Sequence, residues 1–184
     1  MTKGGPERHC VKLFTDGACI PNPGPGGWAF ILKHVSTGRS KESSGGEHGS
    51  TNNRMEIMAV IRGLEALKQA CDVELFSDSD YVVSAITDWM RRWKRFGWKK
   101  SPKSTKPLKN ADLWIRLDKA LEPHRVTAKW IRGHIGHPEN ERCDELANSA
   151  AVQIAQTTPP PPVDLVEANV VEKPYSGSLF DKGE

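Results

Sequence analysis

The apolar positions along this chain alternate between short strand-like runs and longer stretches with helical spacing. Residues separated by three or four positions, such as Ile57, Ile61 and Leu64, are typical of amphipathic helices, whereas compact apolar runs bounded by Gly, Pro or polar residues are typical of strands. On this basis we expect five strands, near residues 11–14, 28–32, 39–45, 73–76 and 126–131. We expect helices near residues 57–67, 82–93, 113–121 and 143–154.

The order of these elements predicts the topology of the sheet. The Pro- and Gly-rich segment 22–27 predicts a turn, and therefore an antiparallel hairpin, between the first two strands. The helix before the fourth strand predicts a right-handed crossover that leaves strands parallel, with their carboxyl ends on the same side. We therefore predict an α/β fold with a five-stranded mixed sheet flanked by helices.

Length and composition indicate one globular domain. With 184 residues and 37% hydrophobic content, the chain can bury a single core. It has no apolar stretch of the roughly 20 residues that a membrane-spanning helix needs. Four cysteines are present without a C-x-x-C pair, and we expect reduced thiols in a soluble, cytoplasmic monomer: Cys10, Cys19, Cys71 and Cys143.

Charge and composition suggest domain boundaries. We expect a flexible N-terminus over residues 1–8 and a domain over 9–156, followed at 157–184 by a Pro-rich, acidic tail that is too sparse in apolar residues to order. The formal net charge is +3, but residues 1–156 alone carry 24 Lys and Arg against 18 Asp and Glu, or +6. Residues 89–109 contain nine Lys or Arg and no Asp or Glu.

Two copies of one tetrapeptide suggest a metal site. Leu13-Phe14-Thr15-Asp16 and Leu75-Phe76-Ser77-Asp78 are strand-like runs that each stop on an aspartate. On neighbouring parallel strands, the two carboxylates would meet at one edge of the sheet and repel each other unless a cation or a proton lay between them. Glu56, near the start of the crossover helix, and Asp144, in the opening turn of the last helix, can face the same edge. Four carboxylates would suit Mg²⁺ or Mn²⁺ rather than zinc.

Each acid also has a purely structural interpretation. Asp16 precedes a glycine, as in many turns, and Asp78 is placed to cap the helix that follows it. Glu56 has capping-box spacing from Asn53, and Asp144 suits a helix N-terminus through the helix dipole. Spacing alone leaves these alternatives open.

Five local strings carry a resemblance to a known family. They are Thr15-Asp16-Gly17, Asn22 to Trp28, Thr51-Asn52-Asn53-Arg54-Met55-Glu56, Ser77-Asp78-Ser79-Asp80-Tyr81-Val82, and Gly133 to Asp144. In this order and at this spacing, the chain resembles bacterial ribonuclease HI, a type 1 ribonuclease H, over about residues 9–155. The resemblance implies a ribonuclease H-like fold with a basic protrusion.

The resemblance also implies an activity. It implies hydrolysis of the RNA strand of an RNA/DNA hybrid with two Mg²⁺ ions, for which Mn²⁺ can substitute, leaving 5′-phosphate and 3′-hydroxyl ends. Asp16, Glu56, Asp78 and Asp144 would be catalytic metal ligands. His134 would be a catalytic loop histidine that shuttles protons, and its flanking glycines permit the loop to move.

Substrate contacts follow from residue type and from the resemblance. Short polar side chains beside the carboxylates can contact 2′-hydroxyls and phosphates across the minor groove of a hybrid: Asn22, Thr51, Asn52 and Asn53. The basic segment resembles the family's protrusion, which grips the DNA strand through phosphate pairing and aromatic contact. Its expected contacts are Arg91, Arg92, Trp93, Lys94, Arg95, Trp98, Lys99 and Lys100.

Two features depart from the family or fall outside its motifs. Asp80 stands where the family commonly has a glutamine that contacts the RNA minor groove, and an ionised acid cannot donate a hydrogen bond. We expect altered affinity or metal occupancy rather than lost activity. In the tail, Ser178-Leu179-Phe180 partly resembles a bacterial sliding-clamp peptide and suggests a replication partner.

Two other functions are compatible with this fold. The first alternative is a non-catalytic module that binds hybrids or duplexes, but such relatives usually lack a metal ligand and all four acids are present here. A transposase or integrase would need additional DNA-binding domains, for which the chain has no room. We therefore favour the nuclease.

Overall fold

The computed structural model describes residues 8–133 and 136–159. The strands are β1 (His9–Cys19), β2 (Gly24–His34), β3 (Ser40–Ser50), β4 (Cys71–Ser77) and β5 (Arg125–Trp130). The helices are α1 (Asn52–Glu65), α2 (Asp80–Ser84), the π-helical turn η1 (Ala85–Trp89), α3 (Met90–Arg95), α4 (Ala111–Leu121) and α5 (Pro138–Ala155). The strands and helices expected from the apolar pattern are confirmed.

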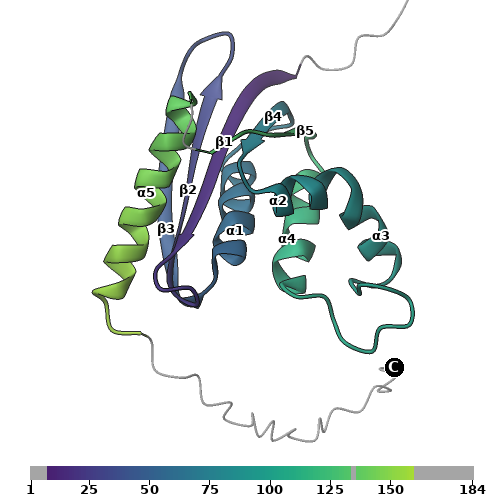
Figure 1. Ribbon diagram of the computed structural model, residues 1–184. Coiled ribbons are helices and arrows are strands. Elements are labelled where there is room, and N and C mark those ends of the chain that lie inside the picture. Colours follow the sequence, from purple (N-terminus) through teal and green to yellow (C-terminus); the bar gives the residue numbers. More distant parts are fainter. Residues whose placement is uncertain (1–7, 134–135, 160–184) are drawn as a thin grey trace, which may run out of the picture.

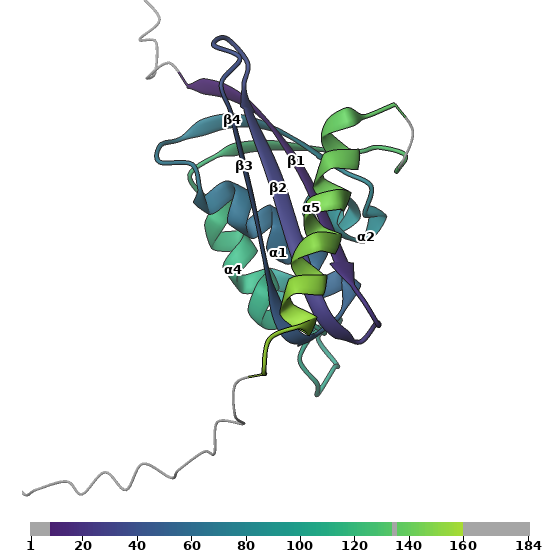
Figure 2. The same cartoon turned by 90° about the vertical axis from the view of Figure 1, so that its left-hand side faces the viewer.

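The five strands form one mixed sheet in the order β3-β2-β1-β4-β5. The first three strands are antiparallel neighbours, and β4 is parallel to both β1 and β5. Helix α5 covers one face of the sheet across β1 and β2, while α1 and α4 lie on the opposite side (Figures 1 and 2). The predicted mixed sheet flanked by helices is therefore confirmed.

The two copies of the tetrapeptide lie side by side in register. In the parallel pair of β1 and β4, Leu13 lies opposite Leu75 and Phe14 opposite Phe76. Both leucines are fully buried in the main core, and the two phenylalanine rings stack with their centroids 4.9 Å apart. Because successive side chains of a strand point to opposite faces, this register brings the two aspartates that end the repeats to the same level of the sheet.

Strand β1 is longer than predicted, and one predicted helix contains a π-helical turn. Strand β1 does not stop at Asp16 but continues to Cys19, because β2 pairs with it as far as the partners Cys19 and Gly26. Of the two tetrapeptides, only the one in β4 lies at the end of its strand. The helix expected near residues 82–93 is a continuous helical segment, α2-η1-α3, with a π-helical turn in the middle.

Helix α5 approaches the sheet closely at Gly27 on β2. A Cβ at this position would lie 2.0 Å from the carbonyl oxygen of Ala147 and 2.6 Å from the backbone nitrogen of Ala151. Glycine therefore permits the contact between helix and sheet that sets the position of α5. Within the described ranges, no helix is long and apolar enough to cross a membrane.

Candidate active site

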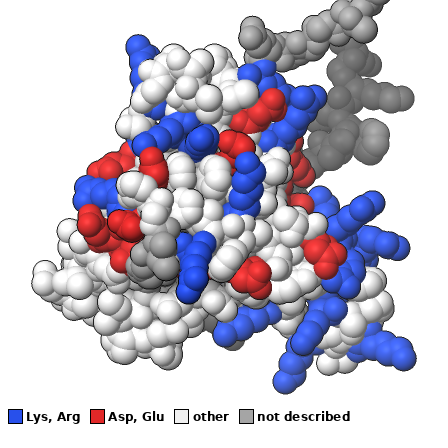
Figure 3. All heavy atoms as spheres, turned by 45° about the horizontal axis from the view of Figure 1, so that its top comes forward, with Lys and Arg blue, Asp and Glu red and all other residues white. Residues whose placement is uncertain are grey.

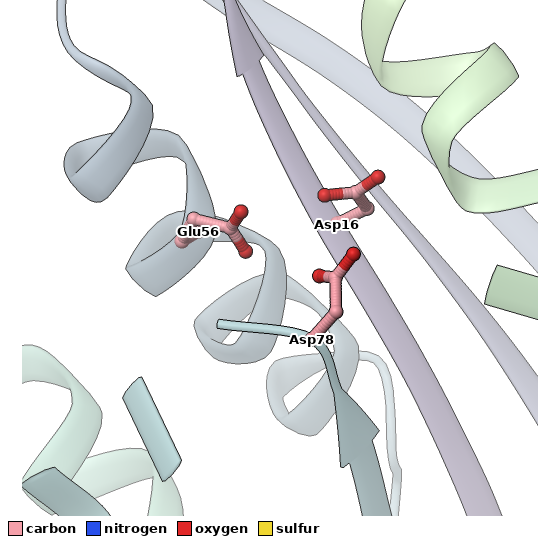
Figure 4. Close-up of side chains that lie close together, drawn as sticks. All are labelled: Asp16, Glu56 and Asp78. Carbon is pink, nitrogen blue, oxygen red and sulfur yellow. The ribbon is translucent and has the colours of Figure 1, made fainter. Parts of the chain in front are cut away.

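Three carboxylates meet at the edge of the sheet. Asp16 comes from β1, Glu56 from α1, and Asp78 follows the last residue of β4. One oxygen from each carboxylate lies within 4.8 Å of the others, and the three side chains point toward one another (Figure 4). The juxtaposition of the first and third acids follows from the register of the repeated tetrapeptides.

A glycine brings the second acid into the cluster. A Cβ on Gly17 would lie 2.3 Å from the backbone nitrogen of Glu56 and 2.4 Å from the carbonyl carbon of Met55. The absence of a side chain therefore lets the first turns of α1 contact β1. Asp16 and Gly17 do not form the turn that the structural interpretation predicted. They belong to β1, in a segment against which α1 packs.

The helix-capping roles considered for Glu56 and Asp78 are performed by other residues. Helix α1 is capped by Thr51, whose hydroxyl accepts a hydrogen bond from Arg54 N at 3.3 Å. Ser79 caps α2 in the same way, accepting from Val82 N at 3.4 Å. The predicted capping box between Asn53 and Glu56 and the predicted cap by Asp78 are therefore wrong. Neither carboxylate is needed to cap a helix.

Asp144 lies near the cluster rather than within it. Helix α5 begins at Pro138, so Asp144 lies two turns inside the helix and not in its opening turn, which rules out the dipole interpretation. Its Oδ1 accepts a hydrogen bond from Asn148 Nδ2 at 2.8 Å. Its negative charge contributes to raising the pKa of Asp16. The structure thus gathers three of the four predicted ligands and places the fourth within electrostatic range.

Burial and mutual repulsion make the cluster electrostatically costly. Asp16 is 6% exposed, and burial, followed by the negative charge of Asp78, raises its pKa to about 7. Burial, and then the charges of Asp16 and Asp78, raise the pKa of Glu56 well above its ordinary value. Glu56 Oε2 and Asp78 Oδ1 are buried without a hydrogen-bond partner among the described residues. A hard divalent cation would satisfy both the charge and these oxygens.

The short polar residues predicted to contact substrate lie at the start of α1. Asn22 Oδ1 accepts a hydrogen bond from Asn52 N at 3.4 Å, which ties the turn after β1 to the helix N-terminus. Asn22, Asn52 and Asn53 are exposed, and Thr51 is the N-cap. This polar surface lies about one helical turn from Glu56.

The basic segment forms a groove with an aromatic lining. A cavity of about 670 Å³ is lined by aromatic rings and flanked by cations. Trp93 is packed in place, with its ring 5.6 Å from that of Trp89 and 5.3 Å from that of Trp114. Lys and Arg side chains gather at the lower right of Figure 3, on the side where α3 and the loop after it lie in Figure 1. The lining residues are Tyr81, Trp89, Arg92, Trp93, Phe96, Lys100, Ser104, Pro107, Leu108 and Lys109.

Two of the basic side chains are paired with acids. Arg92 lies 2.9 Å from Asp88, just before the segment, and Lys94 lies 2.6 Å from Asp118 on α4. The segment itself lacks acids, but the fold supplies them from outside it. The other predicted contacts make no ion pair with any residue that the structure describes: Arg91, Arg95, Lys99 and Lys100.

The remaining predicted residues lie in different settings. Asp80 is exposed at the first position of α2, where its Oδ1 accepts a hydrogen bond from Ser84 Oγ at 3.2 Å. Trp98 is half-buried and packs against the main core. His134 lies outside the described residues.

Sequence reasoning missed two residues that hydrogen-bond to Asp78. Trp130 Nε1 donates to the backbone oxygen of Asp78 at 3.0 Å, and Asn140 Nδ2 donates to its Oδ2 at 3.3 Å. A signal for Asn140 was present, because it precedes Cys143 by three residues and thus extends the inward stripe of α5 by one helical turn. No pattern in the sequence distinguished Trp130.

Comparisons with known proteins agree with this geometry. The sequence model of the RNase H family matches residues 8–152. A ribonuclease H of Bradyrhizobium sp. (strain ORS 278) is 58% identical over 141 residues, covering 77% of this chain and 89% of the relative. A ribonuclease H of Pseudomonas fluorescens is 56% identical over 144 residues, covering 78% of this chain and 93% of the relative. The crystal structure of LC9-RNase H1, a type 1 RNase H with the type 2 active-site motif, matches with a TM-score of 0.72 and 28% identity over 82% of this chain and 76% of that one.

The raised pKa values predict how the stability of the metal-free protein depends on pH. An acid whose pKa rises on folding favours the folded state only while it is protonated, so this contribution is complete below the unfolded pKa of about 4 and is lost as pH rises through the folded pKa. For Asp16, with a folded pKa of about 7, the loss amounts to about 4 kcal/mol between pH 4 and 8. Thermal melts should therefore show that Mg²⁺ stabilises the protein much more at pH 8 than at pH 5.

The variant Asp78→Asn provides the control for this prediction. It removes one charge that raises the pKa values of the other two acids, so its stability relative to the natural protein should increase with pH in the absence of metal. A stability difference between the two proteins that does not change from pH 5 to pH 8 would show that the acids do not repel one another as described.

Proposed function

Since the chain belongs to the ribonuclease H family and is a metal-dependent endoribonuclease, we propose that it hydrolyses the RNA strand of RNA/DNA hybrids. The observation that carries this proposal is the cluster of three carboxylates, one on a buried residue and two on half-buried residues, of which Glu56 and Asp78 each have a buried oxygen without a partner among the described residues. Such a cluster destabilises the protein unless it binds a cation or a proton. A structural role in capping or in a turn does not account for it.

We propose Asp16, Glu56, Asp78 and Asp144 as the ligands of two Mg²⁺ ions, for which Mn²⁺ can substitute. The donor set is composed entirely of carboxylate oxygens, which suits these hard cations. When bound by these residues, two such ions would activate a water for in-line attack on the phosphodiester and would stabilise the departing oxygen. The products would carry 5′-phosphate and 3′-hydroxyl ends. His134 is proposed to move protons during this reaction, as the family resemblance implies.

The chain's own residues would orient the hybrid over this centre. The exposed amides of Asn22, Asn52 and Asn53 can donate to and accept from the 2′-hydroxyls and phosphates of the RNA strand. Thr51 caps the start of α1, where this polar surface lies, and the same helix carries Glu56. We propose that the separation of about one helical turn between this polar surface and Glu56 places an RNA strand, rather than a DNA strand, at the carboxylates.

The aromatic groove would hold the DNA strand. Its cations can pair with phosphates and release counterions, while the packed indole of Trp93 offers a rigid apolar surface. Because Arg92 and Lys94 already pair with acids, we propose that Arg91, Arg95, Lys99 and Lys100 supply most of the electrostatic attraction. Trp98 would contribute from the turn that follows α3.

Other predictions about this protein rest on the sequence alone. A cytoplasmic location, a monomeric state and the domain limits at residues 9 and 156 remain predictions. The replication partner suggested by Ser178-Leu179-Phe180 also remains a prediction, since this segment lies outside the described residues. Binding of the isolated tail peptide to a sliding clamp would test it.

A cleavage assay tests the proposed function. We expect the protein to cut only the RNA strand of a labelled hybrid, to leave duplex RNA and duplex DNA intact, and to stop when divalent ions are chelated. Asp78→Asn should lower the rate by about 1000-fold or more, because a lost ligand removes several kcal/mol of transition-state stabilisation. Cleavage that survives chelation would refute the mechanism, and hybrid binding without any cleavage would support the alternative, a non-catalytic module.

The basic segment over residues 89–109 predicts a salt dependence of hybrid binding. Replacing Lys99 and Lys100 together with alanine should reduce the slope of log affinity against log salt by about 2, since each phosphate contact contributes about 1. The double variant Lys41→Ala/Lys119→Ala changes the net charge equally but lies on β3 and α4, and its slope should stay close to the natural value. Equal slopes for the two double variants would show that only net charge matters.

Replacing Asp80 with glutamine is predicted to increase the affinity of the protein for the hybrid. The Asp80 carboxylate is exposed, two residues after Asp78, and would repel a phosphate, whereas a glutamine could donate a hydrogen bond to the RNA strand. Asp80→Gln should therefore bind the hybrid more tightly, as measured without divalent ions, and should retain cleavage. Unchanged affinity and unchanged cleavage would contradict this interpretation of Asp80.

A further inference from the structure

Asp78 is held at both its backbone and its side chain by donors from other elements. Trp130, the last residue of β5, donates from Nε1 to the Asp78 carbonyl oxygen at 3.0 Å. Asn140, in the first turn of α5, donates from Nδ2 to Asp78 Oδ2 at 3.3 Å. Neither hydrogen bond belongs to a helix or to the sheet ladder. Both donate to Asp78, the one acidic residue of the cluster that lies just beyond a strand end.

The two oxygens of Asp78 have different surroundings. Oδ2 accepts from Asn140, and it also lies so close to Gly133 that a Cβ there would come within 2.5 Å of it. Oδ1 is buried and has no hydrogen-bond partner among the residues that the structure describes. The carboxylate points toward the other two acids (Figure 4). One oxygen is thus fixed by the protein, and the other is available to a cation.

Packing alone does not explain these two donors. The buried positions of α5 are otherwise occupied by small apolar residues, whereas Asn140 is a polar amide that is only 1% exposed and whose Oδ1 has no partner in the described structure. Burying an amide with only part of its hydrogen bonds made costs free energy. Trp130 is 54% exposed, so its indole adds little to the core. In both residues, the feature that stands out is the hydrogen bond to Asp78.

We propose that Asn140 and Trp130 are positioning residues for Asp78. Asn140 holds Oδ2 and so directs Oδ1 toward the cation, while Trp130 fixes the backbone from which the carboxylate projects. This inference rests on the proposed function, because it assigns the residues that orient one of the metal ligands. Hydrogen-bond partners of a metal-ligating carboxylate commonly change metal affinity or activity by about 10- to 100-fold when they are removed.

The test measures metal binding in the absence of substrate. Mn²⁺ alone is titrated calorimetrically into the metal-free, full-length protein at pH 7.5. Asn140→Leu, which keeps the volume but removes the donor, should weaken Mn²⁺ binding by about 10-fold or more. Trp130→Phe, which removes the indole N–H and keeps an aromatic ring, should weaken it by a smaller factor. Hybrid affinity measured without divalent ions should not change in either variant.

A core variant separates positioning from stability. Leu117→Val on α4 shortens a fully buried side chain far along the chain from the carboxylates, so it should lower the melting temperature and leave Mn²⁺ affinity unchanged. If Asn140→Leu does not fold, Asn140→Ser, which retains a donor, and Trp130→Phe carry the test. The serine variant should bind Mn²⁺ more weakly than the natural protein because its hydroxyl does not reach as far.

The possible results lead to different conclusions. Natural protein that binds no Mn²⁺ would overturn the proposed metal centre itself. Natural protein that binds Mn²⁺, with Asn140 and Trp130 variants that bind it equally well, would overturn the positioning roles and leave the metal centre intact. Weakened binding in these variants, with normal binding in Leu117→Val, would support the proposal.

Discussion

Three carboxylates that repel one another, one on a buried residue and two on half-buried residues, determine how the site is built. Asp16, Glu56 and Asp78 each place an oxygen within 4.8 Å of the others, and Asp16 is buried while Glu56 and Asp78 are half-buried. A carboxylate in such a position costs free energy when it is ionised, and this cost is recovered only by a cation or a proton. The fold must therefore keep the three carboxylates together despite their mutual repulsion.

Several unrelated parts of the fold meet this constraint together. The register of β1 and β4 places Asp16 and Asp78 at one level, and Gly17 allows α1 to bring Glu56 to the same edge. Thr51 and Ser79 cap the neighbouring helices, so the acids are not drawn into capping. The polar surface lies at the start of α1, the helix that also carries Glu56, whereas the aromatic groove is lined by Tyr81 on α2 and by residues of η1, α3 and the loop after it.

Much of this arrangement could be predicted from the sequence, because it depends on local patterns. The repeated Leu-Phe-(Thr/Ser)-Asp indicates equivalent strand ends, and the crossover helix between them makes those strands parallel. What could not be predicted depends on contacts between distant segments. The pairing of Lys94 with Asp118 and the hydrogen bond from Trp130 to Asp78 join residues that no periodicity relates. The early start of α5 did have a signal in Pro138, since proline is common at the first helical position.

We propose that the carboxylate cluster binds two divalent ions that act on the scissile phosphate. Anomalous scattering from Mn²⁺ tests it most directly, in crystals of the protein bound to a hybrid with a non-hydrolysable linkage. If the cluster binds two ions, two peaks about 4 Å apart should lie next to Asp16, Glu56 and Asp78. The absence of anomalous density among these three side chains, in crystals where the hybrid occupies the groove, would contradict it.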